Sequence, residues 1–312
     1  MMKKIILDCD PGHDDALAMM LAVASDEIDL LAVTTSAGNQ RPEKTLHNAL
    51  ALLTLMGRTD IPVAGGNRKP LINPLMIADN IHGDSGLDGA TIPQPAFAPQ
   101  PMHAIELMAK TLRESTEKIT LVVTGPMTNA ALFLSVYPEL KTKLERIVFM
   151  GGAMGIGNWQ PSAEFNILVD PEAAKIVIDS GVPVTMVPLN VTHKAQIMSS
   201  EIDAIGSIGN PVATVFHDLL KYFAIYHTDP KWEFAGPPLH DPCTIAWLIA
   251  PEIFVSKTLA VDIELHGART RGETVVDYYH LTPSSPNCQI LLDLDREAFI
   301  NLIHTSLRAF SK

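Results

Sequence analysis

Four aspartates lie within eight residues near the start of the chain, in the run Leu-Asp-Cys-Asp-Pro-Gly-His-Asp-Asp at positions 7–15. Asp10, Asp14 and Asp15 flank a Pro-Gly turn, whereas Asp8 lies inside the preceding apolar run and receives no role. Carboxylates this close repel one another, so some must take up protons unless a cation offsets their charge. Hard cations such as Ca²⁺ prefer an all-oxygen shell. The segment therefore predicts a metal-dependent active site, because helix capping by Asp14 and Asp15 would leave Asp10 unexplained.

Further candidates lie far along the chain. Asp241 precedes a proline that begins an apolar helix predicted over 242–249, so capping that helix is an alternative role for it. His240 beside it could act as a proton donor near neutral pH. Thr124 begins a Thr-Gly-Pro-Met-Thr-Asn junction between a strand and a helix. A free backbone carbonyl there could bind calcium, or the side chains could simply cap the helix, and the residues alone leave both interpretations open.

A predicted loop after the Gly-Gly turn at 151–152 carries Asn158, Glu164, Phe165 and Asn166. Amides and carboxylates of this kind hydrogen-bond sugar hydroxyls well. Isolated loop amides are also common turn formers, so this segment alone does not establish a sugar site.

Two irregular stretches stand out. Residues 73–101 are rich in Pro, Gly and Asp and contain His82, and a structureless stretch of that length is typical of a functional lid or of disorder. Residues 222–240 concentrate aromatic side chains in a chain with only 6% aromatics. This cluster could form an apolar wall for a planar ligand or a seam between helices. Its members are Tyr222, Tyr226, His227, Trp232 and Phe234.

The elements that must position these residues alternate between strand and helix patterns. Apolar runs predict strands at 3–9, 28–35, 119–123, 147–150 and 184–187, and helical spacing predicts helices at 14–24, 42–56, 127–137 and 171–180. This alternation predicts an α/β fold with an open, mainly parallel central sheet flanked by helices. Ligands bind beyond the carboxyl ends of such strands, where Asp10, Asn39 and Thr124 lie. A small antiparallel portion is predicted at 258–265, 274–279 and 288–294, before a closing helix at 296–310.

Composition narrows the class of protein. The 312 residues are 47% apolar, enough for one large core, and the absence of repeats or low-complexity linkers predicts a single domain over 1–312. A net charge of −12 without Lys/Arg clusters argues against nucleic-acid binding. No stretch approaches about 18 uninterrupted apolar residues, which argues against a membrane span. The three separated cysteines, Cys9, Cys243 and Cys288, suggest no disulfide framework and fit a reducing cytoplasm.

Together these segments resemble the inosine-uridine-preferring nucleoside hydrolase family over nearly the whole chain. The resemblance runs from the Asp-rich segment at 7–15, through Gly-Asn at 38–39, Ile-His-Gly at 81–83, Thr-Gly-Pro-Met-Thr-Asn at 124–129 and Ala-Glu-Phe-Asn at 163–166, to His-Asp-Pro-Cys at 240–243. It implies hydrolysis of the N-glycosidic bond of ribonucleosides to ribose and free base, in nucleoside salvage. It also implies a nucleoside hydrolase fold and a homo-oligomer, either a dimer or a tetramer.

The resemblance also implies roles for individual residues. Ca²⁺ would be bound by Asp10, Asp15, the backbone carbonyl of Thr124 and Asp241, and Asp10 would also be the general base for the water on that ion. His240 would lie near the leaving base, as the proton donor proposed for some members. The ribose would contact Asp14, Asn39, Asn158, Glu164 and Asn166. The remaining substrate contacts are expected from Phe165, from the lid around His82 and from the aromatic stretch with Tyr222 and Tyr226.

The base preference is the least determined feature. The resemblance is closest to members that favour uridine and cytidine, whereas aromatic stacking accepts any base. A broad-specificity or purine-preferring hydrolase is therefore the main alternative. A metal-dependent phosphatase is disfavoured because the chain has no Gly-rich phosphate cradle or suitably placed Lys/Arg cluster. A non-catalytic, calcium-dependent nucleoside-binding protein is disfavoured because every proposed catalytic position holds a competent residue.

Overall fold

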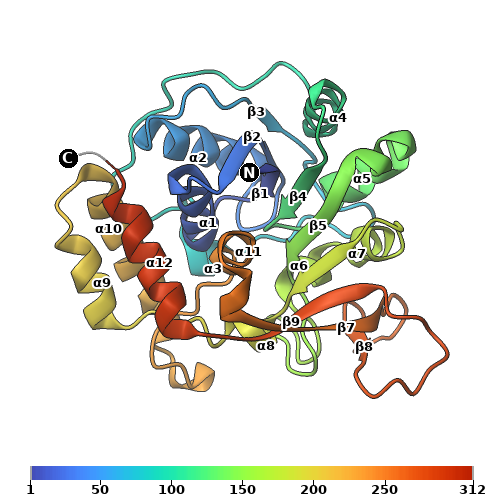
Figure 1. Ribbon diagram of the computed structural model, residues 1–312. Helices are drawn as coiled ribbons and strands as arrows, with labels where there is room; N and C mark the ends of the chain where they lie inside the picture. Colours follow the sequence, from blue (N-terminus) through green and yellow to red (C-terminus); the bar gives the residue numbers. More distant parts are fainter. Residues whose placement is uncertain (1, 311–312) are drawn as a thin grey trace.

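The computed structural model describes residues 2–310, in which nine strands form one sheet (Figure 1). The strand order is β3-β2-β1-β4-β5-β6-β9-β7-β8. The pairs from β3 to β9 in that order are parallel, and β7 pairs antiparallel with both β9 and β8. The strands are β1 (Lys3–Cys9), β2 (Ile28–Thr35), β3 (Val63–Gly65), β4 (Ile119–Val123), β5 (Leu144–Met150), β6 (Val184–Val187), β7 (Phe254–Ile263), β8 (Thr274–Asp277) and β9 (Cys288–Leu294).

Helices cover both faces of the sheet (Figure 1). They are α1 (His13–Ala24), α2 (Pro42–Leu55), α3 (Asp79–His82), α4 (Ala104–Glu114), α5 (Thr128–Val136), α6 (Phe165–Val169), α7 (Pro171–Ile178), α8 (Leu189–Thr192), α9 (Ser199–Gly206), α10 (Pro211–His227), α11 (Pro242–Ile249) and α12 (Arg296–Arg308). Short 3₁₀ turns are η1 (Pro138–Lys143), η2 (Pro230–Trp232) and η3 (Pro251–Ile253). The α/β fold class expected from the alternating pattern is confirmed.

The apolar core has one layer on each face of the sheet. Ile5, Leu7 and Cys9 of β1 join the larger layer, formed with α1, α2, α10, α11 and α12. Ile6 of the same strand joins the other layer, with α4, α5 and α7. Side chains alternate between the faces of a strand, so Asp8 points to the same side as Ile6. There its carboxylate Oδ1 accepts hydrogen bonds from Thr34 and from Asn129 of α5.

The order in which strands are added to the sheet changes side at β1: β2 and β3 lie on one side of it, and β4 and β5 lie on the other. β1 lies between β2 and β4, and all three strands are parallel. The connections that leave the carboxyl ends of β1 and β4 therefore run to opposite sides of the sheet, and a crevice opens between them. The packing of α11 against α1 brings the start of a helix late in the chain to this crevice (Figure 1).

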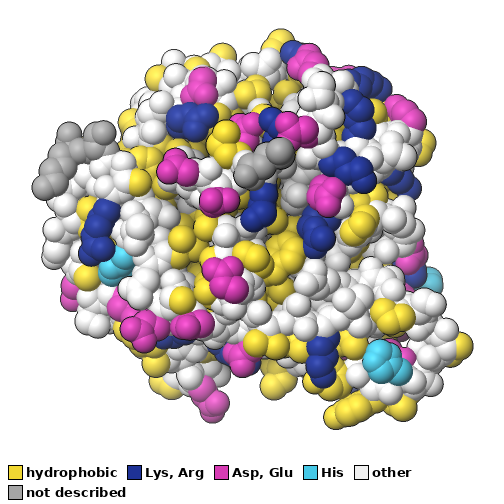
Figure 2. Space-filling model, viewed as in Figure 1, with side chains coloured by type: hydrophobic (Ala, Val, Ile, Leu, Met, Phe, Trp, Pro, Cys, Tyr) yellow, Lys and Arg dark blue, Asp and Glu magenta, His cyan; other side chains and the backbone are white. Residues whose placement is uncertain are grey.

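Some elements differ from the sequence expectation. β9 is antiparallel to β7, as expected, but it also extends the parallel part of the sheet by pairing with β6. The stretch 73–101 contains the one-turn helix α3. The elements β3, α4, α6, α8, α9 and α10 were not predicted. Within residues 2–310, no helix is both long and apolar enough to cross a bilayer. On the face drawn in Figure 2, acidic and basic side chains are interspersed.

Candidate active site

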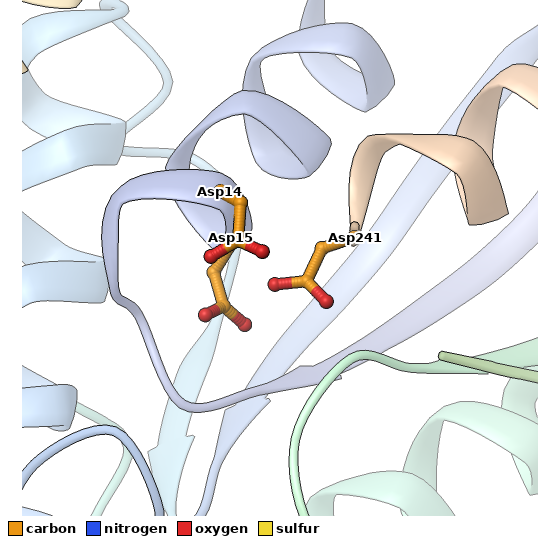
Figure 3. A group of neighbouring side chains, drawn as sticks. All are labelled: Asp14, Asp15 and Asp241. Atoms are coloured by element: carbon orange, nitrogen blue, oxygen red, sulfur yellow. The ribbon is translucent and has the colours of Figure 1, made fainter. Parts of the chain in front are cut away.

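Four buried aspartates meet at the crevice. Asp10 follows β1 directly, Asp14 and Asp15 belong to the first turn of α1, and Asp241 immediately precedes α11. None of the four is more than 5% exposed. Oxygen atoms of Asp14, Asp15 and Asp241 lie within 4.8 Å of one another, and their side chains point toward a common space (Figure 3). Asp10 is not part of this group of three, but its backbone N–H donates a hydrogen bond to the carboxylate of Asp15.

Hydrogen bonds fix two of these carboxylates. Asp15 Oδ1 accepts from the hydroxyl of Thr124 at 2.7 Å and from the backbone N–H of Asp10 at 3.2 Å. Its Oδ2 accepts from the amide of Asn39 at 2.8 Å and from the backbone N–H of Gly12 at 3.0 Å. Asp10 Oδ2 accepts from the backbone N–H of Asn39 at 2.6 Å, whereas Asp10 Oδ1 is buried without a partner.

Helix capping accounts for only part of the cluster. The bond from the backbone N–H of Gly12 to Asp15 Oδ2 caps the start of α1. Asp241 occupies the N-cap position of α11, but its side chain makes no capping hydrogen bond. Its carboxylate points instead toward Asp14 and Asp15. Capping therefore explains one hydrogen bond of Asp15 and neither Asp10, Asp14 nor Asp241.

The electrostatics of the cluster call for a cation. Burial raises the pKa of Asp10 and of Asp241 well above the usual range and that of Asp14 to about 7, and the charge of neighbouring aspartates adds to each rise. Within residues 2–310, no Lys or Arg forms an ion pair with any of the four. The unpartnered Oδ1 of Asp10 and an all-oxygen donor set fit a hard divalent cation.

Beside the aspartates lies a pocket with about 670 Å³ of empty space, which includes the solvent at its open mouth. One set of lining residues, which we call the polar pole, carries carboxylates, amides and a hydroxyl. It consists of Asp14, Asn39, Thr124, Asn158, Glu164, Asn166 and Asp241. The other set, which we call the aromatic pole, consists of Ile81, Trp159, Phe165, His193, Phe223, Tyr226, His227, Trp232, Phe234 and His240. Ala78 and Met150 complete the lining.

The polar pole is rigidly hydrogen-bonded. Glu164 caps α6 and also accepts from the backbone N–H of Gly152 at 3.0 Å. Burial raises the pKa of Glu164 to about 7, although these N–H groups oppose the rise. The amide of Asn166 donates to the backbone carbonyl of Thr124 at 2.7 Å, which holds that carbonyl at the edge of the aspartate cluster. Asn158 accepts from the backbone N–H of Phe165 at 3.0 Å.

The structure brings most of the predicted site residues together. Asp10 and Asp15 lie fully buried next to the pocket, and ten further predicted residues line it: Asp14, Asn39, Thr124, Asn158, Glu164, Phe165, Asn166, Tyr226, His240 and Asp241.

Two predicted substrate contacts lie outside the lining. The imidazole of His82 turns toward α1, where its Nδ1 accepts from the backbone N–H of His13 at 3.2 Å. Tyr222 stacks on the ring of His13 one helical turn before Tyr226, and Gly89 lies against it. Both side chains therefore pack against His13 of α1 and do not face the pocket, because the segment around α3 packs between α1 and α10.

Four residues of the aromatic pole were not predicted from the sequence: Ile81, Trp159, His193 and Phe223. Ile81 and Trp159 lie next to predicted positions, and Phe223 belongs to the aromatic stretch already singled out. His193 is different, because it follows the unpredicted helix α8 and lies far in sequence from every other aromatic-pole residue. Its only sequence signal is its place shortly after the carboxyl end of a predicted strand, β6.

Comparison with known proteins identifies the family. The model of the inosine-uridine preferring nucleoside hydrolase family matches residues 5–301. The chain belongs to this family. This nucleoside hydrolase is 60% identical, over 98% of its length and 99% of the relative, to the pyrimidine-specific ribonucleoside hydrolase RihA of an Escherichia coli strain. The RihA protein of a Klebsiella pneumoniae strain is equally similar, at 60% identity over 98% of this chain and 99% of the relative.

Solved structures agree with this assignment. The purine-preferring ribonucleoside hydrolase from Gardnerella vaginalis superposes with a TM-score of 0.92 at 30% identity, covering 99% of both chains. A plant nucleoside hydrolase, PpNRh1, gives 0.91 at 32% identity, covering 99% of this chain and all of the other. The chain is therefore an enzyme of the nucleoside hydrolase family, which is metal-dependent, and its acidic cluster could bind a metal ion. The family resemblance in the sequence motifs is confirmed.

Proposed function

We propose that this nucleoside hydrolase prefers uridine and cytidine and uses Ca²⁺ held at the aspartate cluster. The observation that carries the proposal is a single pocket lined both by buried carboxylates and amides and by aromatic rings. A ribonucleoside has the same polarity, with a polyhydroxylated ribose joined to a planar base. The 60% identity to relatives named pyrimidine-specific supports the base preference.

The cation would be held by Asp10, Asp15, Asp241 and the backbone carbonyl of Thr124. When bound, it would orient the ribose hydroxyls and lower the pKa of water in the site. Asp14 belongs to the same group of carboxylates as Asp15 and Asp241 and also lines the pocket, so it would contact both the cation and the ribose. Flexible coordination by several carboxylates and a carbonyl is typical of Ca²⁺, whereas Mg²⁺ demands a stricter octahedron.

The polar pole would bind ribose and stabilise it during bond cleavage. Asn39, Asn158 and Asn166 offer amides to hydroxyl groups, and Glu164 offers a carboxylate. Breaking the N-glycosidic bond leaves positive charge on the sugar ring, which the carboxylates around it stabilise.

Asp10 would act as the general base. Its Oδ1 is buried at the aspartate cluster without a hydrogen-bond partner, so it is free to accept a proton from the attacking water. The bond from Asn39 to Oδ2 holds the carboxylate in one orientation.

His240 would assist the departing base. Burial lowers its pKa well below the ordinary range, so the ring is neutral near pH 7. The hydroxyl of Thr192 lies 2.8 Å from Nδ1. When that hydroxyl donates to Nδ1, Nε2 carries the hydrogen, and its N–H can donate a hydrogen bond to the base as negative charge develops on it.

The test is base release from uridine, cytidine, inosine and adenosine, followed by absorbance with and without a strong calcium chelator. We expect uridine and cytidine to be cleaved fastest and the chelator to stop cleavage. Faster cleavage of inosine than of uridine would overturn the base preference, and full activity after chelation would overturn the metal. Assembly as a homo-oligomer, a cytoplasmic location and a single domain remain predictions from the sequence.

A further inference from the structure

His193 occupies an unusual place in the aromatic pole. It follows α8, and its backbone N–H donates to the carbonyl of Leu189 at 2.9 Å, so its position is fixed by the end of that helix. The half-buried imidazole lines the pocket. It packs edge-on against Phe234, with centroids 5.0 Å apart, and against His240, at 5.7 Å. The ring is thus held in place by packing.

Three histidines line the aromatic pole, and two of them are hydrogen-bonded to the protein. His227 Nδ1 lies 3.0 Å from the backbone carbonyl of Phe223. A carbonyl can only accept, so Nδ1 carries the hydrogen and His227 Nε2 is a bare acceptor. His240 Nδ1 contacts the hydroxyl of Thr192. Among residues 2–310, no group hydrogen-bonds either ring nitrogen of His193. Its backbone carbonyl, by contrast, accepts from Gln196.

The protein therefore does not select which nitrogen of His193 carries the proton. Burial, assisted by His227, lowers the pKa of His193 to about 4, so the ring is neutral near pH 7. A neutral imidazole has one N–H donor and one bare acceptor, and the two can exchange places. Unlike His227, whose tautomer is fixed by a carbonyl, His193 has a donor and acceptor pattern that is left to the ligand.

The two pyrimidine bases need such a group. Uracil has a donor N3–H beside the O4 acceptor, whereas cytosine has an acceptor at N3 beside the donor amino group at position 4. A side chain with a fixed pattern would leave a buried polar group unpaired with one of the two bases.

We propose that His193 is a specificity-determining residue that hydrogen-bonds the edge of the pyrimidine and adopts one tautomer for uracil and the other for cytosine. This inference rests on the proposed action on pyrimidine nucleosides. It assigns acceptance of both bases to one side chain, because His227 can only accept and the role proposed for His240 needs its Nε2 to donate.

The first test observes the unmodified residue. Carbocyclic uridine and carbocyclic cytidine keep the bases and hydroxyls but lack the ring oxygen that supports cleavage, so they serve as stable probes. Imidazole ¹⁵N shifts of the calcium-loaded enzyme would be recorded with each probe, with His193 assigned from the spectrum of His193→Asn. We expect the hydrogen on opposite nitrogens of His193 in the two complexes. The same tautomer in both, or no change on binding, overturns the inference.

The second test uses activity. His193→Phe keeps a planar ring but removes both hydrogen-bonding atoms. We expect KM to rise about tenfold for uridine and for cytidine, with kcat little changed. His193→Asn, whose amide offers both a donor and an acceptor, should recover most of that loss. His217→Phe, on α10 outside the pocket lining, is the matched control and should behave like the native chain.

Failure of this inference is distinguishable from failure of the proposed function. If the native chain cleaves uridine and cytidine but His193→Phe leaves both KM values unchanged, His193 has no part in recognition. If the native chain cleaves neither pyrimidine nucleoside, the proposed function itself fails. A circular dichroism spectrum and melting temperature for each variant would verify that it is folded.

Discussion

Asp10 and Asn39 are joined by a 2.6 Å hydrogen bond from the backbone N–H of Asn39 to the carboxylate Oδ2. This bond connects the loop after β1 to the loop after β2, so two neighbouring strand ends set the orientation of one carboxylate. The other oxygen, Oδ1, lies beside Gly125 and has no hydrogen-bond partner. The reactivity assigned to Asp10 therefore depends on a fixed orientation as well as on burial.

Replacing Asp10 by Asn should abolish most turnover. The amide keeps the size of the side chain but cannot accept a proton from water, and loss of a general base lowers rates by roughly 10²–10⁴-fold. We expect kcat for uridine to fall by that factor, measured as base release by absorbance. Asp8→Asn, an equally buried position on β1, is the matched control. An equal loss in both variants would indicate that the substitution acts through folding.

Replacing Gly38 by Ala should displace the same carboxylate. A Cβ at Gly38 would lie 2.1 Å from Asp10 Oδ2 and 2.7 Å from Pro126 Cδ, which is too close for either atom. We expect a loss of uridine cleavage of at least about tenfold, because small misplacements of reacting groups are costly. Gly65→Ala is the control, since its Cβ would meet only a methyl of Leu46 at 3.1 Å. Full activity in Gly38→Ala would show that the orientation of Asp10 is unimportant.

Removing the metal should lower stability as well as activity. Four buried aspartates without a cation repel one another, so the chelated chain should melt at a lower temperature. Adding Ca²⁺ at about 100 times its dissociation constant should restore about 3 kcal/mol of unfolding free energy. Calorimetry with Ca²⁺ and with Mg²⁺ tests this, and we expect the larger rise with Ca²⁺. No change in melting temperature with either ion would contradict a metal at this site.

The metal-free chain should lose stability as the pH rises, partly through Glu164. Burial raises the pKa of Glu164 from 4.5 to about 7, so the folded state binds its proton more tightly than the unfolded state. Its contribution is fully present below pH 4.5 and is lost as the pH rises to about 7. This loss amounts to at most about 3 kcal/mol.

Glu164→Gln cannot titrate, so its unfolding free energy should fall less over the same pH range. Urea unfolding in the presence of a chelator, for both chains between pH 4.5 and pH 8, gives the comparison. Parallel curves for the two chains would mean that Glu164 keeps an ordinary pKa. Glu145→Gln, the same substitution at an exposed position of β5, controls for general effects of net charge.

The sequence was most informative where a pattern is local. The bounds of β1, β2, β4, β6, β9 and α11 follow from apolar runs and from proline, and the structure confirms them. β5 begins three residues before the predicted strand, because the exposed Glu145 and the half-buried Arg146 separate Leu144 from the apolar run that starts at Ile147. The parallel pairing of β9 with β6 could not be predicted, because it depends on where the chain after β8 enters the sheet, and local sequence patterns carry no information about that.

The same distinction holds in the site. The aspartates could be grouped because three lie in one short segment and Asp241 completes a recognisable motif. The side-chain directions of His82 and Tyr222 could not be predicted, since they depend on how α3 and α10 pack against α1. His193 was missed because its neighbours Phe234 and His240 are more than forty positions away.

The division of the pocket into two poles has a consequence for how this enzyme type can diversify. The carboxylates of the polar pole are tied to strand ends and helix starts, whereas much of the aromatic pole comes from the end of α10 and from residues 228–234, outside the sheet. Substitutions there can reshape the space for the base while the bond-breaking end stays intact. A purine-preferring relative with the same fold at 30% identity fits this expectation. Selection for a new nucleobase, in nature or in the laboratory, should therefore concentrate its substitutions at the aromatic pole.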